Sequence, residues 1–150
     1  MNVLIDIGHP AHVHLFKYFA KKMQLKGHQI LFTVRDKEIE IYLLKKYELK
    51  YISLGKKRRT KIAKIWGLIE YTVRIYLISL KFKPNLYLSH GSIYAAWTSF
   101  LMRKPHISME DTGNWEQVRL YKPFTSTILT STSFSIKYGQ KQIFYSCQYA

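Results

Sequence analysis

The chain has 150 residues, which is the size of one domain. Because 47% of the residues are hydrophobic and 15% are aromatic, the chain can bury a core, and this composition excludes intrinsic disorder. Its 24 Lys and Arg residues outnumber 9 Asp and Glu residues, and the formal net charge of +15 indicates a polyanionic partner: nucleic acid, an anionic membrane or a phosphorylated small molecule. The single cysteine, Cys147, excludes an intrachain disulfide framework, and no secretory signal is recognisable, so we expect a cytoplasmic protein.

Short β-rich runs alternate along the chain with longer runs of helical period. The expected strands are 3–7, 28–34, 51–54, 85–89, 105–109, 126–130 and 142–146, and the expected helices are 10–26, 36–46, 61–81 and 92–102. Pro10 suits a first helical turn and Gly27 the position after a last one, while the MEDTGNW segment (109–115) is expected to form an irregular turn. The alternation predicts a doubly wound, Rossmann-like α/β domain, with a parallel sheet between two layers of helices.

Polar or glycine-containing turns are expected directly after the first five strands. They are Gly8-His9, Arg35-Asp36, Gly55-Lys56, His90-Gly91-Ser92 and the EDTG segment at 110–113. In an open parallel sheet, ligands bind outside the carboxyl ends of the strands. These turns therefore predict a binding cleft along one edge of the sheet.

The GHPAHVH segment holds three histidines at the first of these turns. Gly8 allows a sharp turn, and the following helix directs backbone N–H groups toward the cleft, where a phosphate or sugar hydroxyl would bind beside His9 as hydrogen-bond donor or proton carrier. The alternative is a helix cap with surface histidines, which we favour for His12 and His14. Because imidazoles from a turn and a helix start diverge, we expect no metal site.

The end of the fourth strand supplies further candidate residues. His90 and Gly91 leave the sheet there, and Ser92 is expected to start a helix and to direct its hydroxyl and free N–H groups into the cleft as substrate contacts. The alternative is an ordinary strand–turn–helix cap, which explains Ser92 but leaves His90 without a role.

The sequence after the fifth strand provides adjacent carboxylates, Glu110 and Asp111, followed by Thr112. Because neighbouring side chains on an extended chain point to opposite sides, we expect at most one carboxylate to face the substrate as general acid or base, with Thr112 as a substrate contact. The alternative is turn formation by residues 112–114. The sequence contains no nucleophile motif, Walker loop or Gly-x-Gly-x-x-Gly motif, so we expect neither an NTPase nor a bound cofactor.

Six basic residues precede or open the longest expected helix: Lys56, Lys57, Arg58, Arg59, Lys61 and Lys64. That helix carries two apolar stripes on nearly opposite sides, a larger one beginning at Ile62 and a smaller one beginning at Leu68. One stripe is expected to pack on the sheet, and the other needs a neighbour. An anionic membrane surface fits the basic residues, and would hold the protein peripherally on the inner face of the membrane. The alternative is a solvated loop followed by a helix buried on both sides.

The sequence argues against two other roles of this segment, a transmembrane span and nucleic-acid binding. A transmembrane span would place Glu70 and Arg74 near the middle of the bilayer. The sequence argues against nucleic acid, because no aromatic residues are interleaved with the basic ones as a stacking surface requires.

Six segments of the chain carry a family resemblance, in this order: LIDIGHPAHVHLFK, GHQILFTVRDKE, YISLG, KPNLYLSHGSIYAA, PHISMEDT and ILTSTSF. Together they closely resemble an uncharacterised prokaryotic family known only as a domain of unknown function. That family is similar in fold to glycosyltransferases with two Rossmann domains (GT-B), with the lipid II-forming glycosyltransferase and UDP-N-acetylglucosamine 2-epimerases as distant relatives. The resemblance implies that residues 1–150 form a single amino-terminal, acceptor-side domain, and that the carboxyl-terminal nucleotide-sugar domain is absent from this chain.

On this resemblance, Gly8-His9 is the first-strand loop at the interdomain cleft, His90-Gly91-Ser92 the fourth-strand loop, and Glu110 the glutamate that such enzymes often carry after the fifth strand. The implied reaction transfers a sugar from a nucleotide-sugar, bound mainly by the absent domain, to a sugar or lipid-linked acceptor in cell-surface polysaccharide or glycolipid synthesis. A metal-independent mechanism is implied, with His9 or Glu110 deprotonating the acceptor and the helix starts at Gly8 and Ser92 stabilising phosphate charge.

Alone, such a half is expected to be inactive, as a fragment, a truncated product or one chain of a split enzyme. Two alternatives remain open. One is half of a nucleotide-sugar epimerase, and the other is a non-catalytic module that binds a membrane or another polyanion.

Overall fold

The structure, a computed structural model, describes residues 1–36, 38–56 and 61–146, without the side chains of 61–65. Within these residues seven parallel strands form one sheet in the order β3-β2-β1-β4-β5-β6-β7. The strands are β1 (Asn2–Ile7), β2 (Gln29–Asp36), β3 (Tyr51–Lys56), β4 (Leu86–His90), β5 (His106–Met109), β6 (Thr127–Ser131) and β7 (Gln142–Tyr145), and the helices are α1 (Pro10–Leu25), α2 (Glu38–Lys46), α3 (Lys61–Phe82), α4 (Ile93–Leu101) and α5 (Trp115–Tyr121). The predicted doubly wound α/β class is confirmed.

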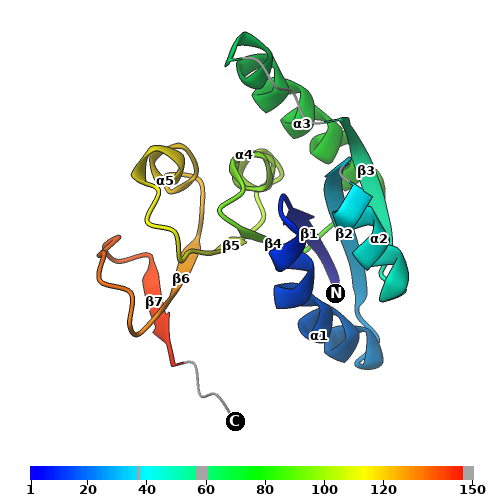
Figure 1. Cartoon of the computed structure of the whole chain (residues 1–150), viewed down its shortest axis with the longest axis horizontal. Helices are drawn as coiled ribbons and strands as arrows, with labels where there is room; N and C mark the ends of the chain where they lie inside the picture. Colours follow the sequence, from blue (N-terminus) through cyan, green and yellow to red (C-terminus); the bar gives the residue numbers. More distant parts are fainter. Residues whose placement is uncertain (37, 57–60, 147–150) are drawn as a thin grey trace.

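The helices cover the two faces of the sheet unequally (Figure 1): α1 and α2 lie on one face, and α3, α4 and α5 lie on the other. Alternation along the central strand explains both cores. Val3, Ile5 and Ile7 are buried in the cluster that includes the apolar residues of α1 and α2, whereas Leu4 packs with Tyr71 of α3. Both faces of β1 are therefore buried, as expected for a central parallel strand.

A row of buried polar side chains crosses the sheet near its carboxyl edge. Asp6 of β1 lies in register with Thr33 of β2 on one side and with Ser89 of β4 on the other. Ser89 in turn pairs with Ser108 of β5, and all of these side chains are buried. Because buried polar groups need hydrogen-bond partners, this row marks the edge of the sheet where the apolar core ends.

Helix α3 buries the smaller of its two apolar stripes. Tyr71 and Ile75 are buried against β1, β3 and β4, whereas most described side chains of the larger stripe, from Trp66 onward, are exposed. The exposed side chains of that stripe are Trp66 (66% exposed), Ile69 (53%), Val73 (48%), Leu77 (54%) and Leu80 (48%). No helix in the described part of the chain is long and apolar enough to span a membrane.

Helix α5 is missing from the sequence-based assignment, which extends an irregular turn to residue 115. Asn114 caps this helix by accepting a hydrogen bond from the Gln117 N–H at 3.3 Å, and Val118 and Tyr121 bury its inner side. The capping asparagine was the available signal. Helix α5 directly follows the loop after β5, which carries Glu110, Asp111 and Thr112. The missed helix therefore adjoins the predicted site residues.

Two of the predicted turns prove to be parts of strands. Arg35 and Asp36 lie in β2, and Gly55 and Lys56 lie in β3, where the prediction ended both strands two residues earlier. The two strand ends pair with each other, Asp36 with Lys56, after an irregularity in the register. Backbone pairing between neighbouring strands therefore overrides the turn-forming tendency of Asp and Gly at these positions.

Candidate functional site

A pocket of about 650 Å³ lies at the carboxyl ends of β1, β4 and β5, beside the starts of α1 and α4. Its lining includes all eight residues predicted as catalytic or substrate-binding: Gly8, His9, His90, Gly91, Ser92, Glu110, Asp111 and Thr112. The structure thus brings together residues more than 100 positions apart in the sequence, at the edge where a parallel sheet binds its ligands. The roles of these residues remain predictions.

The first turn brings two imidazoles to the pocket, not one. His9 is the N-cap of α1, where its Nδ1 accepts a hydrogen bond from the Ala11 N–H at 3.2 Å. His12 also lines the pocket, and its Nδ1 accepts from the Gly8 N–H at 3.3 Å. The prediction that His12 is a surface histidine is therefore wrong, because one helical turn returns it to the side of His9 (5.9 Å between ring centroids). His14 lies outside the pocket lining.

A third imidazole approaches from β4. The His90 ring stacks on that of His12, with centroids 4.6 Å apart and planes inclined by 24°. Its Nε2 lies 2.9 Å from Oδ1 of Asp111, which belongs to the loop after β5. The His90 side chain is only 12% exposed, whereas that of Asp111 is 70% exposed. Sequence reasoning named both residues but did not pair them.

Glu110 is the buried member of the two carboxylates, at 3% exposure. Its Oε1 accepts hydrogen bonds from the Thr112 N–H (2.8 Å), the Thr112 hydroxyl (2.6 Å) and the Gly113 N–H (3.1 Å). Its Oε2 accepts from the Tyr121 hydroxyl at 2.6 Å. Burial and this bond to Glu110 raise the pKa of Tyr121 well above its usual value. Glu110 thus fixes the loop that leads into α5.

Both carboxylates belong to the lining of the pocket, and the expectation that at most one of them faces the substrate stays a prediction. The expectation assumed an extended chain, in which neighbouring side chains diverge. Strand β5 ends at Met109, and the backbone then turns around the Glu110 carboxylate, which accepts the Thr112 and Gly113 N–H groups. This turn brings Asp111 to the pocket as well.

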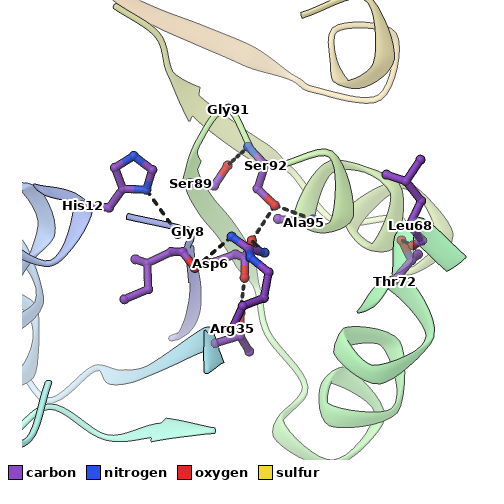
Figure 2. A network of polar contacts seen from close by, with 12 residues as sticks. Asp6, Gly8, His12, Arg35, Leu68, Thr72, Ser89, Gly91, Ser92 and Ala95 are labelled. Atoms are coloured by element: carbon purple, nitrogen blue, oxygen red, sulfur yellow. Dashed lines mark hydrogen bonds and ion pairs between the residues drawn. The ribbon is translucent and has the colours of Figure 1, made fainter. Parts of the chain in front are cut away.

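Sequence reasoning missed the buried ion pair at the base of the pocket (Figure 2). Asp6 is 1% exposed and accepts hydrogen bonds from the hydroxyls of Thr33 (2.8 Å) and Ser92 (2.5 Å). Arg35 donates through Nη1 to Asp6 (3.2 Å) and through Nη2 to the Ile7 carbonyl (2.9 Å). An aspartate inside an otherwise apolar strand was the available signal, because a buried carboxylate needs a partner.

The Ser92 hydroxyl and its neighbouring N–H groups are occupied within the protein. The hydroxyl donates to Asp6 and accepts from the Ala95 N–H at 3.1 Å, as N-cap of α4. The Gly91 N–H donates to the Ser108 hydroxyl and the Ser92 N–H to the Ser89 hydroxyl. Ser92 thereby ties the start of α4 to β1 and has the capping role of the alternative that the sequence analysis left open, while its role as a substrate contact stays a prediction.

The remaining predictions concern a metal site and the six basic residues before and at the start of α3. The described residues contain no group of three or more His, Cys, Asp or Glu side chains placed to hold a metal ion. Lys56 ends β3 and is exposed, and its carbonyl accepts from the Tyr71 hydroxyl at 2.6 Å. Lys57, Arg58 and Arg59, and the side chains of Lys61 and Lys64, lie outside the described residues.

Comparisons with known proteins agree with the fold. The sequence model of a family described as protein of unknown function (DUF354) matches residues 1–137. Among solved structures, MurG of Acinetobacter baumannii superimposes with a TM-score of 0.80 at 13% identity, over 95% of this chain and 45% of that one. No curated protein sequence matches.

Two further structures are similar. The UDP-GlcNAc 2-epimerase of Neisseria meningitidis, bound to UDP-GlcNAc, has a TM-score of 0.72 at 18% identity, over 87% of this chain and 40% of that one. MnaA of S. aureus, in a co-structure with UDP, has a TM-score of 0.73 at 14% identity, over 95% and 44%. The chain therefore spans less than half the length of each of these three proteins, and identities this low show a shared fold alone.

Proposed function

Because the chain belongs to this family of unknown function and has a GT-B-like, Rossmann-like fold, we propose that it is the acceptor-side domain of a nucleotide-sugar-dependent glycosyltransferase. The observation that carries the proposal is the pocket at the carboxyl edge of the sheet, lined by His9, His90 and Glu110 together. Its acceptor would be a sugar or a lipid-linked sugar in cell-surface polysaccharide or glycolipid synthesis. The donor would bind mainly to a carboxyl-terminal domain beyond these 150 residues.

The chemistry of the pocket suits a polyhydroxyl acceptor next to a phosphate-bearing donor. Imidazoles and carboxylates are the side chains that bind sugar hydroxyls and exchange protons with them near neutral pH. The starts of α1 and α4 border the same pocket, and their dipoles favour negative charge there. Because the Gly91, Ser92 and Ala95 N–H groups are bonded within the protein, these helix starts would stabilise a departing nucleotide diphosphate through their dipoles and not through those N–H groups.

Catalysis of transfer needs a group that accepts the proton of the acceptor hydroxyl, and the candidates from the sequence are His9, Glu110 and Asp111. Since Nδ1 of His9 accepts a backbone hydrogen bond, the neutral ring carries its proton on Nε2 and offers a donor to the ligand. Glu110 already accepts four hydrogen bonds. If His9 or Glu110 were that proton acceptor, replacing it with Ala in the transferring enzyme would lower turnover more than acceptor binding, and unchanged kinetics would remove that residue from catalysis.

A nucleotide-sugar epimerase is the second candidate, favoured by the similarity to the Neisseria meningitidis enzyme bound to UDP-GlcNAc. The two functions give different products from the same donor. A glycosyltransferase forms a glycoside of the acceptor and releases the nucleotide diphosphate, whereas an epimerase needs no acceptor and returns an isomeric nucleotide-sugar. Chromatographic analysis of products formed from labelled nucleotide-sugars distinguishes them.

We also propose that the protein works in the cytoplasm, peripherally attached to the inner face of the membrane. The exposed stripe of α3, which includes Trp66, Ile69 and Leu77, supports this location, because an isolated apolar face of this kind calls for a partner. The basic residues of the preceding segment would attract anionic lipid headgroups. Neutralising Lys57, Arg58 and Arg59 is expected to weaken binding to anionic liposomes. Unchanged liposome binding would make this segment an ordinary solvated loop.

The first experiment is to sequence the gene past the codon for Ala150. An open frame that continues into a second Rossmann-like domain supports the glycosyltransferase proposal, and the transfer assay then uses the full product. If the frame closes, the same assay is run on this chain with extract of the source cell, to find a partner that supplies donor binding. The absence of any nucleotide-sugar-dependent product in whichever of these assays applies would contradict the proposal and favour a non-catalytic binding module.

A further inference from the structure

The pocket contains a histidine–carboxylate pair whose geometry differs from that of every other histidine there. Nε2 of His90 lies 2.9 Å from Oδ1 of Asp111. His9 and His12 use Nδ1 to accept backbone N–H groups, whereas His90 uses Nε2 to meet a carboxylate. A carboxylate accepts hydrogen bonds only, so the neutral His90 ring holds its proton on Nε2 and keeps the lone pair on Nδ1.

Two features restrict the orientation of the His90 ring, and a third leaves its Nδ1 available. The ring stacks on His12 with centroids 4.6 Å apart, and the His12 ring is itself fixed by the Gly8 N–H. The His90 side chain is 12% exposed, which limits its rotation, yet it borders the pocket. Within the described part of the chain, the contacts of the His90 ring are the Asp111 carboxylate at Nε2 and the stacked His12 ring, and Nδ1 makes no hydrogen bond. The lone pair that a base requires is therefore unoccupied.

We propose that His90 and Asp111 form the proton-accepting pair of this pocket, in place of His9 or Glu110; the inference rests on the proposed transfer function. The acceptor hydroxyl oxygen attacks the anomeric carbon of the nucleotide-sugar, and the hydroxyl proton passes to Nδ1 of His90. The bond between the anomeric carbon and the phosphate oxygen breaks, and its electron pair leaves with the nucleotide diphosphate. Asp111 stabilises the imidazolium that forms, and His12 is a positioning residue.

Nitrogen-15 NMR of the ring nitrogens of His90 tests the pair in the 150-residue chain, without substrate. Neutral His90 is expected to show a protonated Nε2 and an unprotonated Nδ1. Asp111→Ala is expected to change this spectrum by allowing the other tautomer, whereas Glu116→Ala, which removes an exposed carboxylate outside the pocket, leaves it unchanged. A proton on Nδ1 in the wild type, or a His90 spectrum that does not respond to Asp111→Ala, overturns the proposal.

Kinetics in the transfer assay provide the second test. His90→Gln is expected to lower kcat about 100-fold or more with little change in the KM for the acceptor, while His14→Asn, outside the pocket, leaves kcat unchanged. Because the pair acts as a unit, Asp111→Ala is expected to lower kcat in the wild type but to add nothing to His90→Gln. Losses that multiply in the double variant, or an effect on KM alone, overturn the proposal.

The two experiments separate this inference from the function on which it rests. If the wild type transfers no sugar but the NMR result is as expected, the transfer function and the proton transfer to His90 both fail, and only the hydrogen-bonded His90–Asp111 pair stands. If the wild type transfers sugar and the His90 variants transfer it equally well, the function stands and the pair fails.

Discussion

Gly8 directly follows β1 and lies against the guanidinium of Arg35. A Cβ at this position would lie 2.2 Å from Nη2 of Arg35, much closer than any real contact. The same nitrogen donates to the Ile7 carbonyl at 2.9 Å, and the neighbouring Nη1 holds Asp6. A side chain at this position would therefore have to displace the Arg35 guanidinium from its present contacts.

We predict that Gly8→Ala lowers the free energy of unfolding by about 1–3 kcal/mol, because Arg35 must leave a buried hydrogen bond to make room. Urea unfolding measures this loss. Gly139→Ala is the control for backbone strain. Gly139 has a φ of +85° but nothing within 4 Å of an added Cβ, so any loss of stability in that variant comes from the backbone conformation alone. A loss below about 0.5 kcal/mol for Gly8→Ala would mean that Arg35 moves freely into the pocket.

His106 is buried between Ser89 and Thr125, at 2.9 Å from each hydroxyl, and burial lowers its pKa to about 3. The unfolded chain binds a proton at this residue below about pH 6.5, whereas the folded chain stays neutral down to about pH 3. Stability is therefore expected to fall as pH decreases through this window.

The slope contributed by His106 approaches about 1.4 kcal/mol per pH unit well below pH 6.5. Urea unfolding of the wild type and of His106→Gln between about pH 7 and pH 4.5 measures it, since glutamine retains hydrogen-bonding groups but does not titrate. The variant is expected to be less stable at pH 7 and to lose less stability on acidification. Parallel curves for the two proteins would contradict the assignment of this slope to His106.

At the scale of elements, helix α3 shows both what the sequence predicts and what it leaves open. The 3.6-residue period predicted two apolar stripes on one helix. Because both stripes contain large apolar side chains, the period did not indicate which of them packs on the sheet. Which stripe is buried depends on residues of other elements. The buried stripe packs against strands β1, β3 and β4, in a cluster of Leu4, Leu54, Tyr71, Ile75 and Tyr87. Stripe positions follow from local period, whereas which stripe is buried follows from tertiary packing.

The exposed stripe of α3 supports a prediction about membrane binding. Ile69→Gln together with Leu77→Gln is expected to weaken binding to phosphatidylglycerol vesicles about tenfold or more, because each loses about 1 kcal/mol of apolar burial. Both side chains are more than half exposed, so the fold is expected to keep its stability. Leu25→Gln, at the 89% exposed end of α1, is the control. Equal vesicle binding by the control and the double variant would contradict the role of the stripe.

The loops after β1, β4 and β5 show why most site residues were predictable and the network beneath them was not. The strand-end rule locates Gly8, His90 and Glu110 correctly because it needs only the alternation of strands and helices. The bond from Ser92 to Asp6 joins residues 86 positions apart, and the His12–His90 stack depends on the register of β1 against β4. Such contacts are properties of the folded sheet, which a local pattern does not contain.

At the scale of the whole molecule, the proposed membrane binding has two contributions, the formal charge of +15 and the exposed apolar face of α3, and they are expected to respond differently to salt. Electrostatic attraction weakens as the Debye length falls from about 10 Å at 0.1 M to about 3 Å at 1 M. Apolar burial is not screened in this way. The dependence of vesicle binding on ionic strength therefore reports the charge, and its magnitude at fixed salt reports the helix face as well.

We predict that wild-type binding to anionic vesicles weakens about tenfold or more between about 0.05 M and 0.5 M NaCl. Replacing Lys57, Arg58 and Arg59 by Ala is expected to flatten this dependence, whereas Ile69→Gln with Leu77→Gln lowers affinity at every salt concentration and leaves the slope unchanged. Duplex DNA of equal charge is the control ligand. If DNA binds as tightly as the vesicles, and only the basic replacements weaken either complex, the charge serves a general polyanion interaction and the membrane location is wrong.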